Sequence, residues 1–560
     1  MRKSLCGLLI FLSSMVAAQT INPYQYTITK NIKVQHGAVV SAHPLASAVG
    51  ASILKQGGNA VDAAIATQLA LAVVYPAAGN IGGGGFMVIH LANGKDLTLD
   101  FREKAPLKGH RDMYLDAQGN ADLNKSQEGH LAAGVPGAVA GIFKAMEHAR
   151  LPFKTLVQPA IDLAARGFAI TEAEARSLNG TQEDFRKANT HRTVFVRDQP
   201  WKAGDTLQQP ELAATLERIR DQGKKGFYEG ETARLIVEEM QRGKGIISYE
   251  DLEKYEAVWR EPSVFTYKGY RIVTMPLPSS GGVLLPMMMK MTERFPIGRY
   301  GFHSPKAVQL MTEIERLAYA DRAKFLGDPD FYKVPVKTLT SEAYITERLK
   351  RYQPGVAGKS AEIGPGTTES EETTHLSVAD NQGNAVSLTT TLNGGYGCHT
   401  VVGGAGFLLN NEMDDFSVKP GVPNMYGAVG GEANAIEPGK RMLSSMTPVI
   451  ALRNGRPVFV TGTPGGTTIT TSVYQTLLNL IDFGLSANDA VNKPKFHMQW
   501  LPDLLYVEKE FPATLQAALQ KMGYTVQQRG HIGRTELIVI KNGVLEAVGD
   551  FRGDDAAAGY

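Results

Sequence analysis

Cysteine is nearly absent from this sequence, which has only Cys6 and Cys398 in 560 residues. Cys6 lies in an N-terminal stretch that begins with basic residues 2–3, continues with apolar residues and ends with a small pair at 17–18. This pattern is typical of a secretory signal peptide, so we expect residues 1–18 to be removed. The remaining chain keeps Cys398 alone and can form no internal disulfide. It therefore fits a bacterial periplasm and a core large enough to need no covalent link.

Net charge and long hydrophobic runs are also lacking. The chain carries 58 Lys and Arg against 56 Asp and Glu, and loss of Arg2 and Lys3 with the signal brings the balance close to zero. A nucleic-acid partner or a polybasic membrane surface is therefore not expected. The apolar part of the signal is too short to span a bilayer, and no later stretch resembles a membrane helix. No metal or organic cofactor motif occurs, so we predict that the protein needs no cofactor.

What is present is an ordinary globular composition, with 43% hydrophobic residues and 59 glycines. Apolar spacing predicts helices over 45–58, 59–75, 136–149, 153–166, 210–222, 230–242, 306–326 and 467–483. Alternation around turns predicts hairpins over 86–106, 263–275, 371–393 and around 453–455. Helices interleaved with antiparallel hairpins favour layered sheets covered by helices. Residues 353–372 lack apolar periodicity, and we expect an exposed, mobile segment there.

The hairpin over 371–393, "EETTHLSVADNQGNAVSLTTTLN", carries an unusual number of hydroxyls. A turn centred on Gln382 pairs residues whose numbers sum to 764, which gives one continuous apolar face and one continuous polar face. A slip of one residue would mix the two faces and is disfavoured. In this register Thr373 lies opposite Thr391, with Cβ atoms roughly 5 Å apart, at the open end of the hairpin.

Two interpretations of this pair remain open from the pattern alone. Threonine favours strands and pairs well with threonine, and this is the commoner case. Alternatively, a cut before Thr373 would create an α-amino group with an ordinary pKa of about 8, which could serve as the base that a weak hydroxyl nucleophile requires.

Seven motifs, in order along the chain, make the sequence similar to the γ-glutamyltranspeptidase family. They are "LDFREKAP", "TTHLSVAD", "TLNGGYG", "LLNNEMDDFS", "KPGVPNMYG", "RMLSSMTP" and "GTPGGTT". The resemblance implies an α+β fold, the four-layer αββα sandwich of the N-terminal nucleophile hydrolases. It also implies self-cleavage between Glu372 and Thr373, which would give a large subunit (19–372) and a small subunit (373–560) as a heterodimer. Thr373 would be the nucleophile, and Thr391 would orient it.

The resemblance assigns the substrate's α-carboxylate to Arg102, Ser444 and Ser445. The commoner alternative for a lone arginine is a surface residue paired with Glu103 or a similar acid. A planar guanidinium nevertheless suits a carboxylate well.

The substrate ammonium is assigned by the resemblance to Asn393, Glu412 and Asp415. A turn-forming acid cluster is the plain alternative for residues 410–416. A metal site is not favoured there, because no histidine lies nearby and the spacing is not that of a calcium loop.

The glycines of "GTPGGTT" lie between a predicted strand and a predicted helix. The resemblance makes Gly465 and Gly466 the oxyanion hole, which fits backbone N–H groups exposed before a helix. A plain connecting turn is the alternative, and a phosphate loop lacks its Gly-Lys-Ser/Thr. In members of the family that have a lid, the tyrosine matching Tyr426 covers the pocket, so the resemblance implies a lid here; an ordinary exposed loop is the alternative. His375 faces Thr389 in the hairpin and is expected to be structural, and the "GNIGGGG" run (79–85) is expected to provide close packing.

The function implied is a secreted or periplasmic γ-glutamyltransferase/hydrolase that acts on glutathione and other γ-glutamyl compounds, with amino acids, peptides or water as acceptors. One rival is a glutaryl or cephalosporin acylase of the same superfamily. Another is a non-catalytic protein that binds an amino acid. The acids of residues 410–416 and the long segment 417–445 favour the first over the acylase, and the Thr-Thr-His hairpin disfavours the binding protein.

Overall fold

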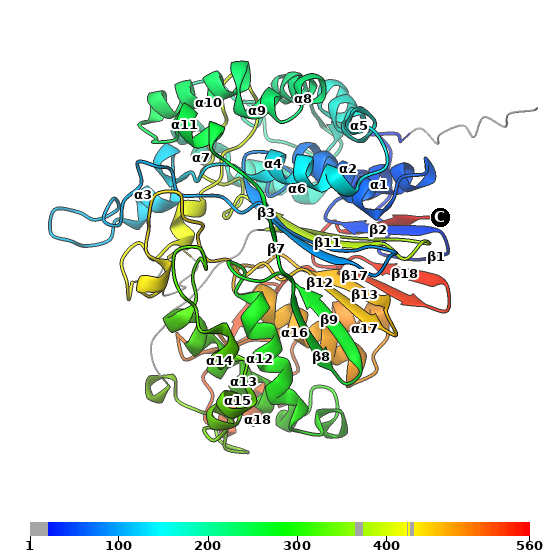
Figure 1. Cartoon of the computed structure of the whole chain (residues 1–560), viewed down its shortest axis with the longest axis vertical. Helices are drawn as coiled ribbons and strands as arrows, with labels where there is room; N and C mark the ends of the chain where they lie inside the picture. The colour runs from blue at the N-terminus through cyan, green and yellow to red at the C-terminus, as the bar shows by residue number, and fades with distance from the viewer. Residues whose placement is uncertain (1–20, 364–372, 423, 426–429) are drawn as a thin grey trace, which may run out of the picture.

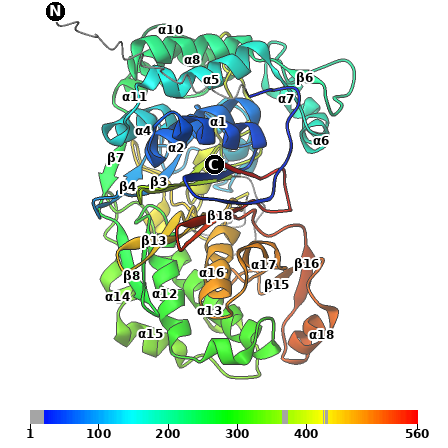
Figure 2. The same cartoon turned by 90° about the vertical axis from the view of Figure 1, so that its right-hand side faces the viewer.

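Two seven-stranded antiparallel sheets lie face to face, with helices on both outer sides, in a computed structural model of the chain. The structure describes residues 21–363, 373–422, 424–425 and 430–560. Figure 1 shows four layers from top to bottom, and Figure 2 shows the same layers after a quarter turn. The αββα sandwich predicted from the sequence is confirmed by this arrangement.

The first sheet contains the threonine hairpin at its centre. In spatial order its strands are β19 (Ala556–Gly559), β2 (Gly37–Ser41), β10 (Thr374–Asp380), β11 (Ala385–Thr391), β3 (Gly84–His90), β4 (Asp96–Asp100) and β7 (Val258–Arg260). The helices on its side of the molecule are α1 (Pro44–Lys55), α2 (Ala60–Val74), α3 (Leu123–Gln127), α4 (Ala138–Ala145), α5 (Phe153–Arg166), α6 (Glu172–Gly180), α7 (Gln182–Ala188), α8 (Pro210–Gln222), α9 (Lys225–Tyr228), α10 (Gly230–Gly243) and α11 (Tyr249–Glu253).

The second sheet packs on the inner face of the first. Its strands, again in spatial order, are β1 (Asn31–Val34), β18 (Val544–Val548), β17 (Glu536–Lys541), β13 (Arg456–Gly462), β12 (Val449–Arg453), β9 (Tyr270–Thr274) and β8 (Ser263–Tyr267). Its helices are α12 (Gly281–Glu293), α13 (Pro305–Phe325), α14 (Val336–Leu339), α15 (Glu342–Leu349), α16 (Thr468–Ile481), α17 (Ala487–Asn492) and α18 (Ala513–Lys521).

The remaining elements are short. Two small sheets consist of β5 (Phe168–Ala169) with β6 (Thr206–Leu207), and of β14 (Phe496–His497), β15 (Leu505–Glu508) and β16 (Val526–Arg529). Single 3-10 turns are η1 (His130–Ala132), η2 (Met146–His148), η3 (Ile297–Tyr300), η4 (Ser360–Glu362), η5 (Glu412–Asp415) and η6 (Glu432–Asn434).

The register of the threonine hairpin is confirmed. Thr374 pairs with Thr390 and Ala379 with Ala385, so that paired numbers sum to 764. The apolar face, which includes Leu376, packs in the core beneath the first helical layer. The polar face points at the second sheet, where the hydroxyl of Ser387 donates to the carbonyl of Thr461 at 3.0 Å. The hydroxyls thus supply hydrogen bonds between two buried sheets, as buried polar groups require.

All eight predicted helices are present, with α4 ending at Ala145 and a 3-10 turn completing the expected 136–149. The side chain and backbone of Asn59 form a reciprocal capping box with Asp62 that begins α2. Helix α12 was missed by the sequence analysis because it begins with two glycines and contains Pro286, both unfavourable in helices.

The segment predicted to be exposed over 353–372 is only partly described. Residues 353–363 are mostly exposed, but Ser360 is buried and its backbone carbonyl accepts a hydrogen bond from the indole of Trp500 at 3.0 Å. This anchored point corrects the expectation for residue 360. Residues 364–372, with Glu372, lie outside the described residues, as do residues 1–20 and Tyr426.

Candidate active site

The two threonines predicted to face each other do so at the open end of the central hairpin. Thr373 immediately precedes β10 and Thr391 ends β11, and their hydroxyl oxygens lie 3.4 Å apart. Both residues are buried, with 6% and 2% of their surface exposed. The strand pairing therefore fixes the relative position of the two hydroxyls.

The backbone around Thr391 is held from the other side by the glycine-rich run. The amide of Asn80 donates to the Thr391 carbonyl at 2.9 Å, and a Cβ at Gly83 would lie 2.1 Å from that same oxygen. Only glycine permits this approach, so the close packing predicted for this run is confirmed. Beyond the strand, the backbone N–H of Asn393 donates to the Thr391 hydroxyl oxygen at 2.7 Å.

The threonine pair opens into a small cavity of about 30 Å³, which has room for one or two water molecules. Its lining comes from the end of β11, from α13 and α16, and from the turns and loops between elements: Arg102, Arg322, Thr373, Thr391, Asn393, Glu412, Asp415, Phe416, Asn424, Gly430, Asn434, Leu443, Ser444, Ser445, Met446, Gly466 and Ile469. Most of the site residues predicted from sequence are thus brought together, from positions more than 300 residues apart.

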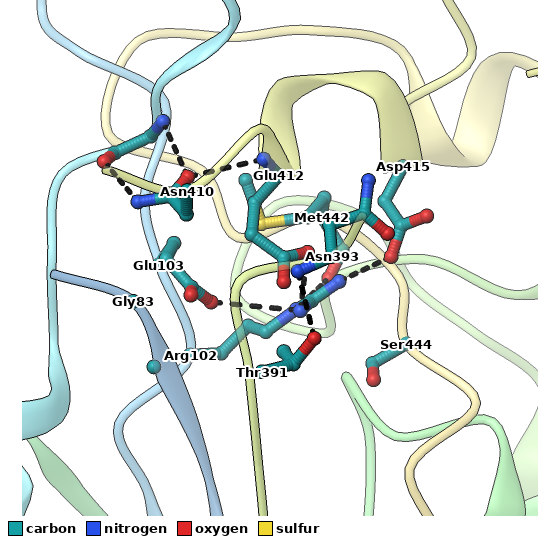
Figure 3. Close-up of polar contacts among 12 residues, drawn as sticks. Gly83, Arg102, Glu103, Thr391, Asn393, Asn410, Glu412, Asp415, Met442 and Ser444 are labelled. Carbon is teal, nitrogen blue, oxygen red and sulfur yellow. Dashed lines mark hydrogen bonds and ion pairs between the residues drawn. The ribbon is translucent and has the colours of Figure 1, made fainter. Parts of the chain in front are cut away.

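Arg102 crosses this cavity just after β4, and Figure 3 shows its guanidinium between two acids. Its two terminal nitrogens form ion pairs with Glu412, at 2.5 Å, and with Asp415. Glu103 lies 3.5 Å from the same guanidinium. Arg102 is only 1% exposed, so the surface arginine considered as an alternative is wrong. Burial disfavours its charge, but Glu412 and Asp415 outweigh this and raise its pKa.

The acids sit on the 3-10 turn η5, which begins where Asn410 fixes the chain. The side-chain oxygen of Asn410 accepts from the backbone N–H of Glu412 at 3.0 Å and of Gly134 at 2.8 Å. Burial raises the pKa of Glu412 well above its ordinary value and also raises that of Asp415. Charge on these acids therefore depends on a nearby cation, which Arg102 provides here.

Asn393 completes the cavity with a strained backbone. Its φ of +75° is in the left-handed region, which asparagine tolerates better than most residues. The side-chain amide donates to the carbonyl of Asn411 at 3.0 Å. Asn393 and the two acids thus line one cavity, as the resemblance implied.

Ser444 and Ser445 also line the cavity. The backbone of Ser444 is held by the N–H of Ser280 and the carbonyl of Pro278, at 2.7 and 2.9 Å. The hydroxyl of Ser445 accepts from the guanidinium of Arg322 at 3.1 Å. Arg322 was missed by the sequence analysis, because within α13 it looks like an ordinary charged helical residue and only the fold brings it here.

The glycine turn leads from β13 into α16. Gly465 has φ of +132° and Gly466 of +52°, so both adopt backbone conformations that favour glycine. Gly466 lines the cavity and Gly465 is not among its lining residues. Within the described part of the chain, neither backbone N–H donates a hydrogen bond.

His375 is enclosed between the sheets and does not line the cavity. Its ring nitrogens lie 2.9 Å from the Thr389 hydroxyl and 3.1 Å from that of Ser377. Burial lowers its pKa to about 3, so the ring is neutral. Its contacts agree with the structural position expected from the hairpin.

Comparison with known proteins places this geometry in context. The family model for Gamma-glutamyltranspeptidase matches residues 46–560. The chain belongs to this family. It is 46% identical to the glutathione hydrolase proenzyme of Escherichia coli K12, over 98% of this chain and 96% of that one.

Relatives with other printed names are more distant. An acylase ACY 1 proenzyme from Pseudomonas sp. V22 is 37% identical over 92% of each chain. The crystal structure of a cephalosporin acylase from Bacillus halodurans superposes with a TM-score of 0.81 at 27% identity, covering 98% of this chain and 99% of that one. The matches confirm the family, the enzyme class and the αββα fold expected from the sequence.

Neither a membrane helix nor a metal cluster is found in the described ranges. No helix there has the length and apolar content needed to cross a bilayer. No group of three or more His, Cys, Asp or Glu residues there is arranged to hold a metal ion.

Proposed function

We propose that this enzyme transfers the γ-glutamyl group of glutathione and related γ-glutamyl amides to amino acids, peptides or water. The observation that supports it most is the convergence, in one cavity, of a paired threonine hydroxyl, a buried arginine, the buried Glu412 and the half-buried Asp415. A γ-glutamyl group carries an ammonium and a carboxylate on one carbon, and this cavity contains partners for both charges.

The first step is maturation of the precursor. The chain cleaves itself between Glu372 and Thr373, which yields a large subunit (19–372) and a small subunit (373–560) that remain together as a heterodimer. Self-cleavage needs a hydroxyl beside the scissile peptide bond. The Thr373 hydroxyl is in that position, and Thr391, whose hydroxyl lies 3.4 Å away, orients it. The word proenzyme in the name of the Escherichia coli relative supports processing of this kind.

In catalysis, the new α-amino group of Thr373 takes the proton from its own hydroxyl as the oxygen attacks the γ-carbonyl carbon. The developing oxyanion is stabilised by the N–H groups of Gly465 and Gly466. The C–N bond breaks, the leaving amine takes the proton, and a γ-glutamyl ester remains on Thr373. An amine or water then attacks this ester in the same way and regenerates the hydroxyl.

Substrate orientation falls to the charged groups. Arg102, Ser444 and Ser445 hold the α-carboxylate, while Asn393, Glu412 and Asp415 hold the ammonium. In the free enzyme Arg102 pairs with the two acids. A bound α-amino acid therefore replaces these internal ion pairs with external ones, its carboxylate on Arg102 and its ammonium on the acids, and leaves no charge unpaired. The resemblance assigns the cover over the bound group to Tyr426, which lies outside the described residues.

Location and partners follow from the sequence. The N-terminal signal pattern supports export to the periplasm or the medium. The substrates and acceptors are small molecules, and neither nucleic acid nor a membrane takes part. No metal or organic cofactor is required by this mechanism.

A turnover assay tests the proposal. The purified, processed protein should hydrolyse a γ-glutamyl anilide, and a dipeptide acceptor should accelerate anilide release and give a γ-glutamyl dipeptide detectable by mass spectrometry. Binding of glutamate without any turnover would favour the amino-acid-binding protein and contradict the proposal.

A further inference from the structure

Arg322 is a second buried guanidinium in the cavity, and its surroundings differ from those of Arg102. It lies in the last turn of α13 and is 8% exposed. Its Nη2 donates to the hydroxyl of Ser445 at 3.1 Å, and its Nε donates to that of Ser280 at 3.3 Å. In the described part of the chain it forms no ion pair, whereas Arg102 forms three.

The direction of these hydrogen bonds determines what Ser445 can offer. A guanidinium can only donate, so the Ser445 oxygen accepts and its own hydrogen remains available. Within the described residues this hydroxyl makes no other hydrogen bond. Because Ser445 lines the cavity, the hydrogen can donate to a ligand there.

The charge of Arg322 acts on the same region. Burial raises the pKa of Asp415, and the positive charges of Arg102 and Arg322 both oppose that rise. Arg322 is therefore close enough to influence the acid that pairs with Arg102. When a ligand ammonium pairs with Asp415, two guanidiniums remain on the side of the cavity that carries Ser444 and Ser445, which favours an anion there.

We propose that Arg322 is a positioning residue for the α-carboxylate of the substrate, acting by presenting the Ser445 hydroxyl as a donor and by adding positive charge behind it. This inference rests on the proposed function and extends the set of residues that select the substrate. Arg102 then serves both the carboxylate and the acids, while Arg322 serves the carboxylate end alone.

Two substrates separate this role from a general structural one. A γ-glutamyl anilide carries the α-carboxylate, and a 4-aminobutyryl anilide lacks it but keeps the amino group. We expect Arg322→Gln to lower kcat/KM for the γ-glutamyl anilide at least about tenfold, mostly through KM, as loss of a hydrogen bond to a charged group does. The 4-aminobutyryl anilide should change less than about twofold. L-glutamate and 4-aminobutyrate as competing ligands provide the same comparison independently of turnover.

Controls keep the result interpretable. Lys324→Gln removes an exposed charge from the same helix and should leave both substrates unaffected. Arg322→Lys keeps the positive charge but lacks the planar, two-pronged guanidinium, so its kcat/KM for the γ-glutamyl anilide should fall less than that of Arg322→Gln. If Arg322→Gln fails to mature into two chains, Arg322→Lys is compared instead, and a smaller loss that is again confined to the γ-glutamyl anilide is expected. Combining Arg322→Gln with Ser445→Ala should cost less than the sum of the two single losses, since part of the effect of Arg322 passes through Ser445.

Equal losses on both substrates, or no loss on either, would overturn the proposal. If the proposed function is wrong, the unmodified enzyme will not hydrolyse the γ-glutamyl anilide, and this result is obtained before any variant is compared.

Discussion

The contacts between the enzyme and the substrate's ammonium group can be tested by omitting that group from the substrate, without changing the enzyme. This comparison gives the sharpest quantitative prediction. A γ-glutamyl anilide and a glutaryl anilide differ only in the α-amino group. If Glu412 and Asp415 bind that group, the glutaryl compound should be the poorer substrate. An acylase acting on glutaryl amides would show no such preference.

The structure sets the size of the effect. Removing a partner from a buried ion pair costs about 3–5 kcal/mol when the remaining charge has no other partner. Here Arg102 still pairs with both acids when the ammonium is missing, at 2.5 Å in the case of Glu412. The glutaryl anilide should therefore lose transition-state binding free energy at the lower end of this range, about 3 kcal/mol, which corresponds to a kcat/KM roughly a hundredfold lower than that of the γ-glutamyl anilide.

The assay compares initial rates of anilide release for both substrates with unmodified enzyme and with Asp415→Ala. The substitution should narrow the ratio, mainly by harming the γ-glutamyl substrate. Glu432→Ala, which removes an exposed acid from the same region of the chain, should leave the ratio unchanged. Equal hydrolysis of the two anilides by the unmodified enzyme would mean that the acids do not hold an ammonium, and the acylase would then be the better assignment.

Three further predictions concern the hairpin, the glycine turn and the buried acid beside Arg102. Thr391→Val keeps the shape but removes the hydroxyl, and should slow processing and turnover by about a hundredfold; the same change at Thr461, whose buried hydroxyl makes no hydrogen bond with described residues, should not. The variant Gly465→Ala should fold but have no turnover. Its backbone φ is +132° and the new Cβ would lie 2.5 Å from a threonine hydroxyl, so the substitution would distort the glycine turn. Normal turnover would mean that this glycine does not form the oxyanion hole. Burial raises the pKa of Glu103 from 4.5 to about 7, so its protonated form stabilises the fold at low pH and that contribution, roughly 3 kcal/mol, is lost as pH rises from 4.5 to 7. Between pH 4.5 and 7 the melting temperature should fall less in Glu103→Gln than in the unmodified protein or in the exposed control Glu510→Gln. Identical plots of melting temperature against pH for the three proteins would contradict the raised pKa of Glu103.

The hairpin could be predicted in detail because its period of two fixes which residues share a face. Alternation of apolar and hydroxyl residues around one turn leaves a single register that separates the faces, and the structure has that register. The same local logic predicted α2 from its Asn59 cap. Local patterns could not predict α12, where Pro286 is tolerated inside a buried helix.

The candidate site, too, was only partly predictable from local sequence patterns. Its motifs identify Arg102 and the acids as members of one cavity, but no pattern along the chain indicates that they pair with each other in the free enzyme. Arg322 could not be found at all, because its position depends on the packing of α13 against the loop that carries Ser445. Contacts between segments more than a hundred residues apart depend on the fold, and a single sequence does not encode them in any local feature.

The central claim is that Thr373 becomes the N-terminal nucleophile by self-cleavage, and N-terminal sequencing of the purified, processed protein on a denaturing gel tests it most directly. We predict two chains, the smaller beginning at Thr373, and a single uncut, inactive chain for Thr373→Ala. The cut should also form in protein purified from a cell-free system, since no other protease is needed. An intact chain with full activity, or a small subunit that begins at another residue, would contradict the account.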